Sequence, residues 1–121
     1  MSYKDFSWLD SVPYSFDFKE VGTLRVVIKD RDESCKEYTV QDNVDLIKES
    51  IASLPVHGDE YLKMNPVQIT FVIGLKENNP IAKIVFYDNF LQGENTAFFS
   101  SEEVTHKVLE LKKLLTESIR E

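Results

Sequence analysis

Apolar and polar residues alternate through the first third of the chain, and this period of two predicts three β-strands. Aromatic residues alternate with polar ones over 14–19, and aliphatic residues do so over 24–28. A polar cluster at 30–34 is typical of a hairpin turn, and a third alternating run covers 36–41. The positions expected on the core face are Tyr14, Phe16, Phe18, Leu24, Val26, Ile28, Tyr38 and Val40.

Two segments have the apolar spacing of amphipathic helices. The first follows Asp42 or Asn43, either of which can cap it, and Pro55 limits it. The second follows Ser100, which with Glu103 forms a capping-box pattern. The apolar stripes expected against the core are Val44, Ile47, Ile51 and Leu54 in the first helix, and Val104, Val108, Leu111, Leu115 and Ile119 in the second.

Between these helices the sequence predicts another pair of strands. Pro66 opens the first, where Val67, Ile69, Phe71 and Ile73 alternate with Gln68, Thr70 and Val72. A turn at 76–80 leads to the second, over 81–88. Both faces of 81–88 are largely apolar, which indicates either an interior strand or a second covered surface. Residues 96–99 are expected to form either a further short strand or an extended loop.

The order of these elements favours an α+β class with two layers. We expect an antiparallel sheet of five to six strands with helices packed on one face, in the order (α)βββαββ(β)α. The leading segment, with Phe6, Trp8 and Leu9, is expected to form a short helix or a hydrophobic plug. The length of 121 residues fits a single domain, which we place at 1–121.

Composition narrows the function classes. A formal net charge of −7 is opposite to the basic footprint of a nucleic-acid binder. No apolar run is long enough to cross a bilayer, and the first residues lack the pattern of a secretory signal. Cys35 is the only cysteine, which excludes an intramolecular disulfide and a cysteine-based zinc site. We therefore expect a cytoplasmic protein that binds neither nucleic acid nor membrane.

The sequence contains no recognisable catalytic, metal or cofactor motif. The only mixed chemical cluster is His57-Gly58-Asp59-Glu60-Tyr61, which is also an ordinary composition for a polar loop. His106 falls on the solvent side of its helix. The acidic run at 30–33 lacks the glycine and the distal glutamate of a calcium loop. We therefore predict a protein that is not an enzyme and has no cofactor or metal.

Protein binding is the function that these observations favour. Residues 1–65 contain 13 acidic and 8 basic side chains, whereas the remaining residues contain 8 and 6. An acidic surface of this kind steers a basic partner toward it. We therefore predict a small acidic inhibitor, of the immunity-protein or antitoxin type, that neutralises another protein. The predicted contact residues are Asp30, Asp32, Glu33, Asp42, Asp45 and Glu49.

Three alternatives remain open. The element order resembles the α-βββ-α-ββ-α arrangement of secretion chaperones, which implies an extended client, or a homodimer, held through Val85 and Tyr87. No motif carries this resemblance, and the leading helix would be unusually short. A small enzyme would use the His57 loop, with Asp59 or Glu60 as base and Tyr61 positioning the substrate. Mimicry of nucleic acid by ordered carboxylates is the third alternative.

Overall fold

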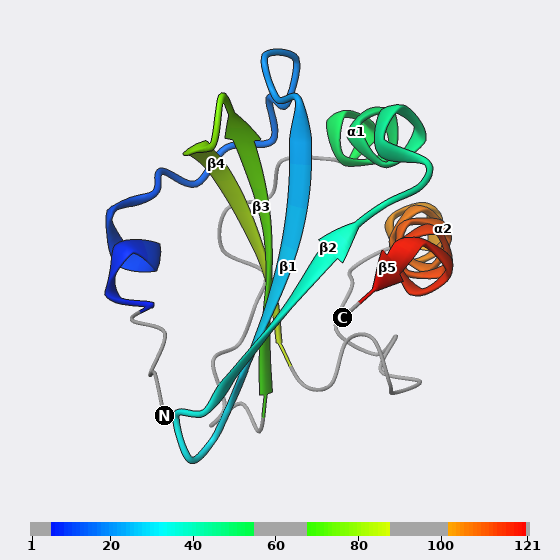
Figure 1. Ribbon diagram of the computed structural model, residues 1–121. Coiled ribbons are helices and arrows are strands. Elements are labelled where there is room, and N and C mark those ends of the chain that lie inside the picture. The colour runs from blue at the N-terminus through cyan, green and yellow to red at the C-terminus, as the bar shows by residue number, and fades with distance from the viewer. Residues whose placement is uncertain (1–5, 55–67, 88–101, 121) are drawn as a thin grey trace.

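The protein is an α+β fold built on one open antiparallel sheet, and the computed structural model describes residues 6–54, 68–87 and 102–120 (Figure 1). The five strands lie in the order β4-β3-β1-β2-β5. The strands are β1 (Thr23–Asp30), β2 (Cys35–Val40), β3 (Gln68–Lys76), β4 (Asn79–Tyr87) and β5 (Ile119–Arg120). The helices are the 3-10 helix η1 (Ser7–Ser11) and the α-helices α1 (Val44–Ser53) and α2 (Glu102–Ser118).

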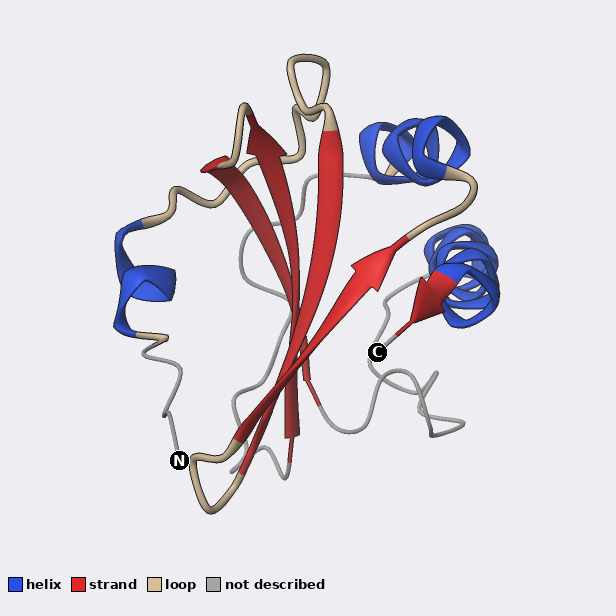
Figure 2. Cartoon of the chain, in the orientation of Figure 1, coloured by secondary structure: helices blue, strands red, loops and turns tan. Residues whose placement is uncertain are grey.

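Both α-helices cover the same face of the sheet (Figure 2). The predicted stripes account for this, because Ile47 and Ile51 of α1 and Leu111 and Leu115 of α2 are all fully buried. They pack against side chains that alternate along the strands. The sheet side of this core consists of Leu24, Val26, Ile28, Val40, Val72, Ala82, Ile84 and Phe86.

The two helices run antiparallel to each other. Asn43, at the start of α1, donates a side-chain hydrogen bond to Ser118 at the end of α2. At the other end of the pair, the Lys107 ammonium reaches the carbonyl of Ser53. Asn43 occupies the predicted cap position, but its side chain bonds Ser118 and not a backbone N–H of its own helix. No helix in the described ranges is long and apolar enough to cross a membrane.

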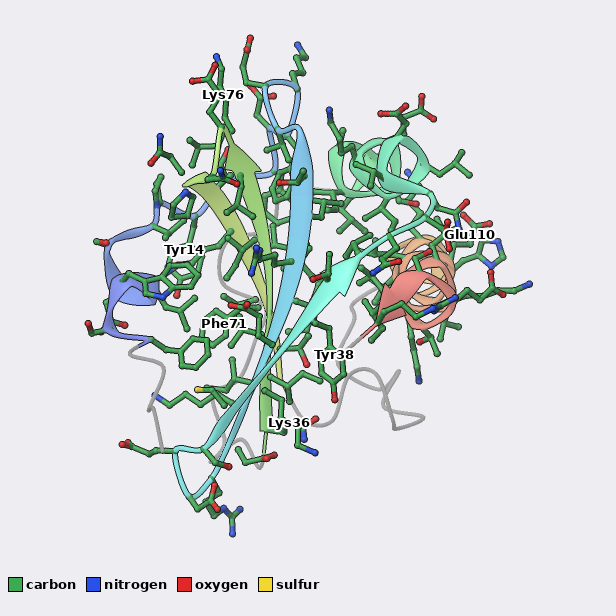
Figure 3. The ribbon with its side chains drawn as sticks, in the orientation of Figure 1. Tyr14, Lys36, Tyr38, Phe71, Lys76 and Glu110 are labelled. Carbon is green, nitrogen blue, oxygen red and sulfur yellow. The ribbon has the colours of Figure 1, made fainter. Side chains whose placement is uncertain are left out.

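A second, smaller core lies on the opposite face of the sheet. Leu9 of η1 packs there with Val27, Ile73 and Leu75, and Phe71 borders the group. This confirms the expected short leading helix with an apolar contact surface. Figure 3 shows Phe71 and Tyr14 on the η1 side of the sheet and Tyr38 on the side of the α-helices.

Residues 14–19 do not form the strand that their alternation predicts. Tyr14 makes one isolated parallel bridge with Lys83, and no further ladder follows. Phe18 is buried in the core beneath the α-helices, whereas Tyr14 is 69% exposed on the other side of the sheet. The segment passes around the sheet edge, so alternation here does not mean one shared face.

The orientation of β3 also differs from expectation. Val72 pairs with Val26 and faces the α-helices, so Ile69, Phe71 and Ile73 face the η1 side. The alternation alone predicts the opposite, because it makes the face with Ile69, Phe71 and Ile73 the more apolar one and Val72 a residue of the minor face. A second cover over the sheet makes this orientation favourable, because it keeps those side chains from water.

Strand β4 is an edge strand with a second covered surface, and it is not an interior strand. Glu77 and Asn78 both have positive φ angles and form the tight turn that joins it to β3. Ile119, expected at the end of the last helix, instead lies in β5 and pairs with Val40. The predictions for Pro66, Ser100, residues 96–99 and the His57 loop lie outside the described residues.

Candidate protein-binding surface

The predicted contact residues divide into two groups in the structure. Asp30, Asp32 and Glu33 lie at the β1–β2 hairpin tip, and the other three lie beyond the far end of β2, at α1. Strand β2 has six residues, so at about 3.3 Å per residue the two groups are separated by about 20 Å. One flat contact centred on either group would not include the other.

The hairpin tip uses its carboxylates to hold its own shape. Asp30 accepts a hydrogen bond of 2.8 Å from the Gln68 amide. Asp32 accepts two from Ser34, one from the hydroxyl and one from the backbone N–H. These two bonds stabilise the carboxylate and lower the pKa of Asp32 below its ordinary value. Arg31 is also exposed at the tip, so the charge there is mixed.

The second group forms a continuous exposed stripe along α1. We define the α1 stripe as Asp42, Asp45, Leu46 and Glu49, and all four side chains are exposed. Within the helix, the spacing of Asp45, Leu46 and Glu49 places them on one side, and Asp42 immediately precedes the helix cap. The two aspartates near the helix N-terminus also interact favourably with the helix dipole, which supports the helix even without a partner.

The only lysine of α1 is turned away from this stripe. The Lys48 ammonium donates a hydrogen bond of 2.6 Å to the carbonyl of Val21 and a longer one to that of Lys19. Arg120 lies 3.9 Å from the Asp42 carboxylate, a loose and exposed pair. The carboxylates of Asp45 and Glu49 thus face solvent with the helix's own cation directed elsewhere.

Leu46 adds an exposed apolar side chain to the α1 stripe. Its side chain is 52% exposed, although its neighbour Ile47 is completely buried. Leu46 and Leu109 both lie away from the apolar stripes of their helices in the sequence, and both are exposed in the structure. A leucine bordered by carboxylates is suited to a contact that needs both burial of apolar area and opposite charge.

Two described residues, His106 and Cys35, carry side chains of the types that commonly act in catalysis. His106 is exposed, as expected, and its Nε2 lies 3.3 Å from the Glu110 carboxylate one helical turn away. Partial burial raises the pKa of the Cys35 thiol, which makes it a poor nucleophile. Within ranges 6–54, 68–87 and 102–120, no three metal-binding side chains come together.

Sequence reasoning missed Lys83, the most unusual charged residue in the described structure. Its side chain is 3% exposed on the second face of β4. Burial lowers the pKa of its ammonium group, and the nearby Asp10 carboxylate partly offsets this effect. The available signal was a lysine in the middle of a strand whose two faces are otherwise apolar.

Comparisons with protein-family models, with curated proteins and with solved structures find no significant match to this chain.

Proposed function

We propose that this protein binds and neutralises a partner protein through the α1 stripe, with a basic surface on the partner as the complement. The observation that carries the proposal is the arrangement on α1. Exposed Asp45 and Glu49 lie beside exposed Leu46, and Asp42 lies just before the helix, while Lys48 is bonded to backbone carbonyls on another side of the helix.

The carboxylates are suited to raising the rate of association with the partner, and Leu46 is suited to slowing its dissociation. Opposite charge raises the rate at which two proteins associate, and the effect falls with ionic strength because the Debye length is only about 8 Å at physiological salt. Burial of a side chain such as Leu46 mainly slows dissociation. Because α1 is anchored by Ile47 and Ile51, the stripe is presented on a rigid element.

We favour the α1 stripe over the hairpin tip as the contact surface. At the tip, Asp30 and Asp32 are engaged by Gln68 and Ser34, and Arg31 brings positive charge. We also favour it over client binding at the β4 edge. There the backbone of Lys83 is hydrogen-bonded to Pro13 and Ser15, so an extended client would have to displace that segment.

The test is affinity capture from the native host, at low and high salt, followed by mass spectrometry and rate measurements on the purified partner. Asp45→Asn with Glu49→Gln is the charge variant. Glu20→Gln with Glu77→Gln is the matched control, since it removes the same number of exposed carboxylates elsewhere. We expect the charge variant to associate about tenfold more slowly at low salt, and the control to associate nearly as fast as wild type.

A second variant, Leu46→Ala, separates the effect of the leucine on dissociation from the effect of the carboxylates on association. We expect it to speed dissociation with little change in the association rate. If the partner binds the charge variant and Leu46→Ala as it binds wild type, the α1 stripe is not the contact surface. If association is also independent of salt, electrostatic steering is excluded.

A further inference from the structure

The N-terminal segment crosses the second face of the sheet and touches the sheet edge at one point. We call residues 6–15 the strap. Its helix η1 places Leu9 on the apolar side chains of β1 and β3. After η1, two backbone hydrogen bonds join it to β4, from the Lys83 N–H to Pro13 and from the Ser15 N–H to the Lys83 carbonyl. This isolated bridge is a small attachment compared with a strand ladder.

The side chain beneath the strap is that of Lys83. Its ammonium donates a hydrogen bond to the carbonyl of Leu9, lies 4.5 Å from the centre of the Tyr14 ring, and lies 5.9 Å from that of Phe71. Leu9 and Tyr14 belong to the strap, so closing the strap completes the enclosure of the amine. Figure 3 shows Tyr14 and Phe71 on this side of the sheet.

Among the described residues, no charged group neutralises Lys83 by direct contact. Its neighbours on β3, Phe71 and Ile73, are uncharged. On β1, Arg25 lies one strand further along the same row and is paired with Glu37 of β2 at 2.6 Å. From the strap, Asp10 is exposed and acts on the amine through its charge.

A buried ammonium that is paired only with a carbonyl and aromatic faces retains part of its desolvation cost. Opening the strap returns water to this amine but breaks its hydrogen bond to Leu9 and its contact with the Tyr14 ring. Because burial is the larger effect and lowers the pKa of the amine, the charge on Lys83 favours the open form. Opening also uncovers apolar side chains of β1 and β3, which favours the closed form. The two effects oppose each other within one short segment.

We infer that the strap opens and closes as a unit, and that the charge on Lys83, enclosed between Leu9 and Tyr14, sets the balance between the two forms. Protonated Lys83 holds the strap in a weakly closed state. Neutral Lys83 closes it firmly. The open form exposes the β4 edge and the apolar face containing Val27 and Ile73.

The direction of the pH dependence follows from the lowered pKa of Lys83 in the closed form. The open form, with a solvated amine, keeps a pKa near 10.5 and therefore binds protons more strongly. The strap closes as the pH rises through the lowered pKa of Lys83, and the closure is complete near pH 10.5. Each unit of difference between the two pKa values changes the opening equilibrium constant about tenfold.

Trp8 provides the measurement, because it is the only tryptophan and lies half-buried within the strap. Acrylamide quenching of its fluorescence reports how often the strap is open. Lys83→Met retains most of the apolar stem without charge, and Lys83→Arg stays charged throughout the range. We expect weak, pH-independent quenching for Lys83→Met and strong, pH-independent quenching for Lys83→Arg. As pH rises, quenching of wild type should weaken from the level of Lys83→Arg toward the level of Lys83→Met.

Two controls isolate the amine. Far-ultraviolet circular dichroism at each pH separates strap opening from global unfolding. Tyr14→Phe removes the phenol hydroxyl beside the amine but keeps the ring, and it should retain the pH dependence of wild type. A wild-type quenching constant that stays flat up to pH 10.5 would overturn the inference. So would equal quenching of Lys83→Met and Lys83→Arg, both folded, at neutral pH.

Discussion

The side-chain amide of Asn43 donates a hydrogen bond of 2.9 Å to the hydroxyl of Ser118, a residue 75 positions later in the chain. Ser118 is completely buried, so this bond satisfies a hydroxyl that water does not reach. Asn43 also has a φ of 59°, a left-handed conformation that asparagine tolerates better than most residues. One residue thus sets both the entry into α1 and its contact with α2.

We expect Asn43→Ala to lower the free energy of unfolding by about 2–4 kcal/mol, measured by urea denaturation. The loss has two sources, an unpaired buried hydroxyl at Ser118 and an alanine forced into left-handed backbone. Asn43→Gly removes the hydrogen bond but tolerates the backbone, so it should lose about 1 kcal/mol less. Equal losses for the two variants would show that the backbone conformation carries no strain.

The structure leaves no space for a side chain at Gly74 of β3. A Cβ atom there would overlap a methyl group of Val21 and lie 3.1 Å from a ring carbon of Phe18, both in the buried core. We expect Gly74→Ala to lower the free energy of unfolding by about 1–3 kcal/mol, because the packed side chains must move.

Gly22 is the matched control for Gly74. Its added Cβ would meet only the Leu75 carbonyl oxygen, at 3.9 Å, which is an ordinary contact. Gly22→Ala should change stability by no more than about 0.5 kcal/mol. A similar loss for both variants would mean that the crowding around Gly74 is not the cause.

Asp32 should make the hairpin tip sensitive to acid. Its folded-state pKa lies below the ordinary value of 3.8, chiefly because of the Ser34 hydroxyl hydrogen bond. The stabilisation is therefore complete above pH 3.8 and is lost as pH falls through the lower, folded-state value. In Ser34→Ala, the pKa of Asp32, followed by carboxyl NMR, should rise toward 3.8.

Denaturation of wild type and Ser34→Ala at several pH values tests the same linkage through stability. Wild type should be the more stable of the two at neutral pH, and the part of the difference that comes from Asp32 ionisation should disappear in acid. A difference that stays constant across the acid range would show that the serine acts without the carboxylate charge.

Local periodicity was sufficient to predict the type and the buried side of an element that has one buried face. The stripes of α1 and α2 and the alternation of β1 and β2 predicted helices and strands that the structure confirms, within the described ranges. A period of 3.6 or 2 places apolar side chains on one side of a helix or strand regardless of the partner. The α+β class and the antiparallel sheet followed from the order of these elements.

Local periodicity failed where an element contacts two surfaces. Tyr14 and Phe18 alternate like residues of one strand face, yet they lie on opposite sides of the sheet. The face of β3 that contains Phe71 looks like the main core face but lies against η1. In both cases, the sequence does not show that η1 covers the second face of the sheet.

The α1 stripe was likewise predicted in part from the sequence and decided in part by the tertiary structure. The sequence identified Asp42, Asp45 and Glu49 as acidic and Leu46 as outside the apolar stripe, because helical spacing alone fixes which residues share a side. The orientation of Lys48 was decided by the tertiary structure, since the carbonyls that bind it belong to a loop preceding β1. The α1 stripe is acidic partly because of that distant contact.

The sequence by itself determined the element types, the main buried stripes and the excess of negative charge, because these depend on residue identity and spacing. Only the tertiary structure decided which side of the sheet each face meets, that Lys48 is directed away from the carboxylates of α1, and that Lys83 lies beneath Tyr14. Those features depend on contacts between residues far apart in the chain, such as Lys83 and Leu9. Local spacing contains no information about such contacts.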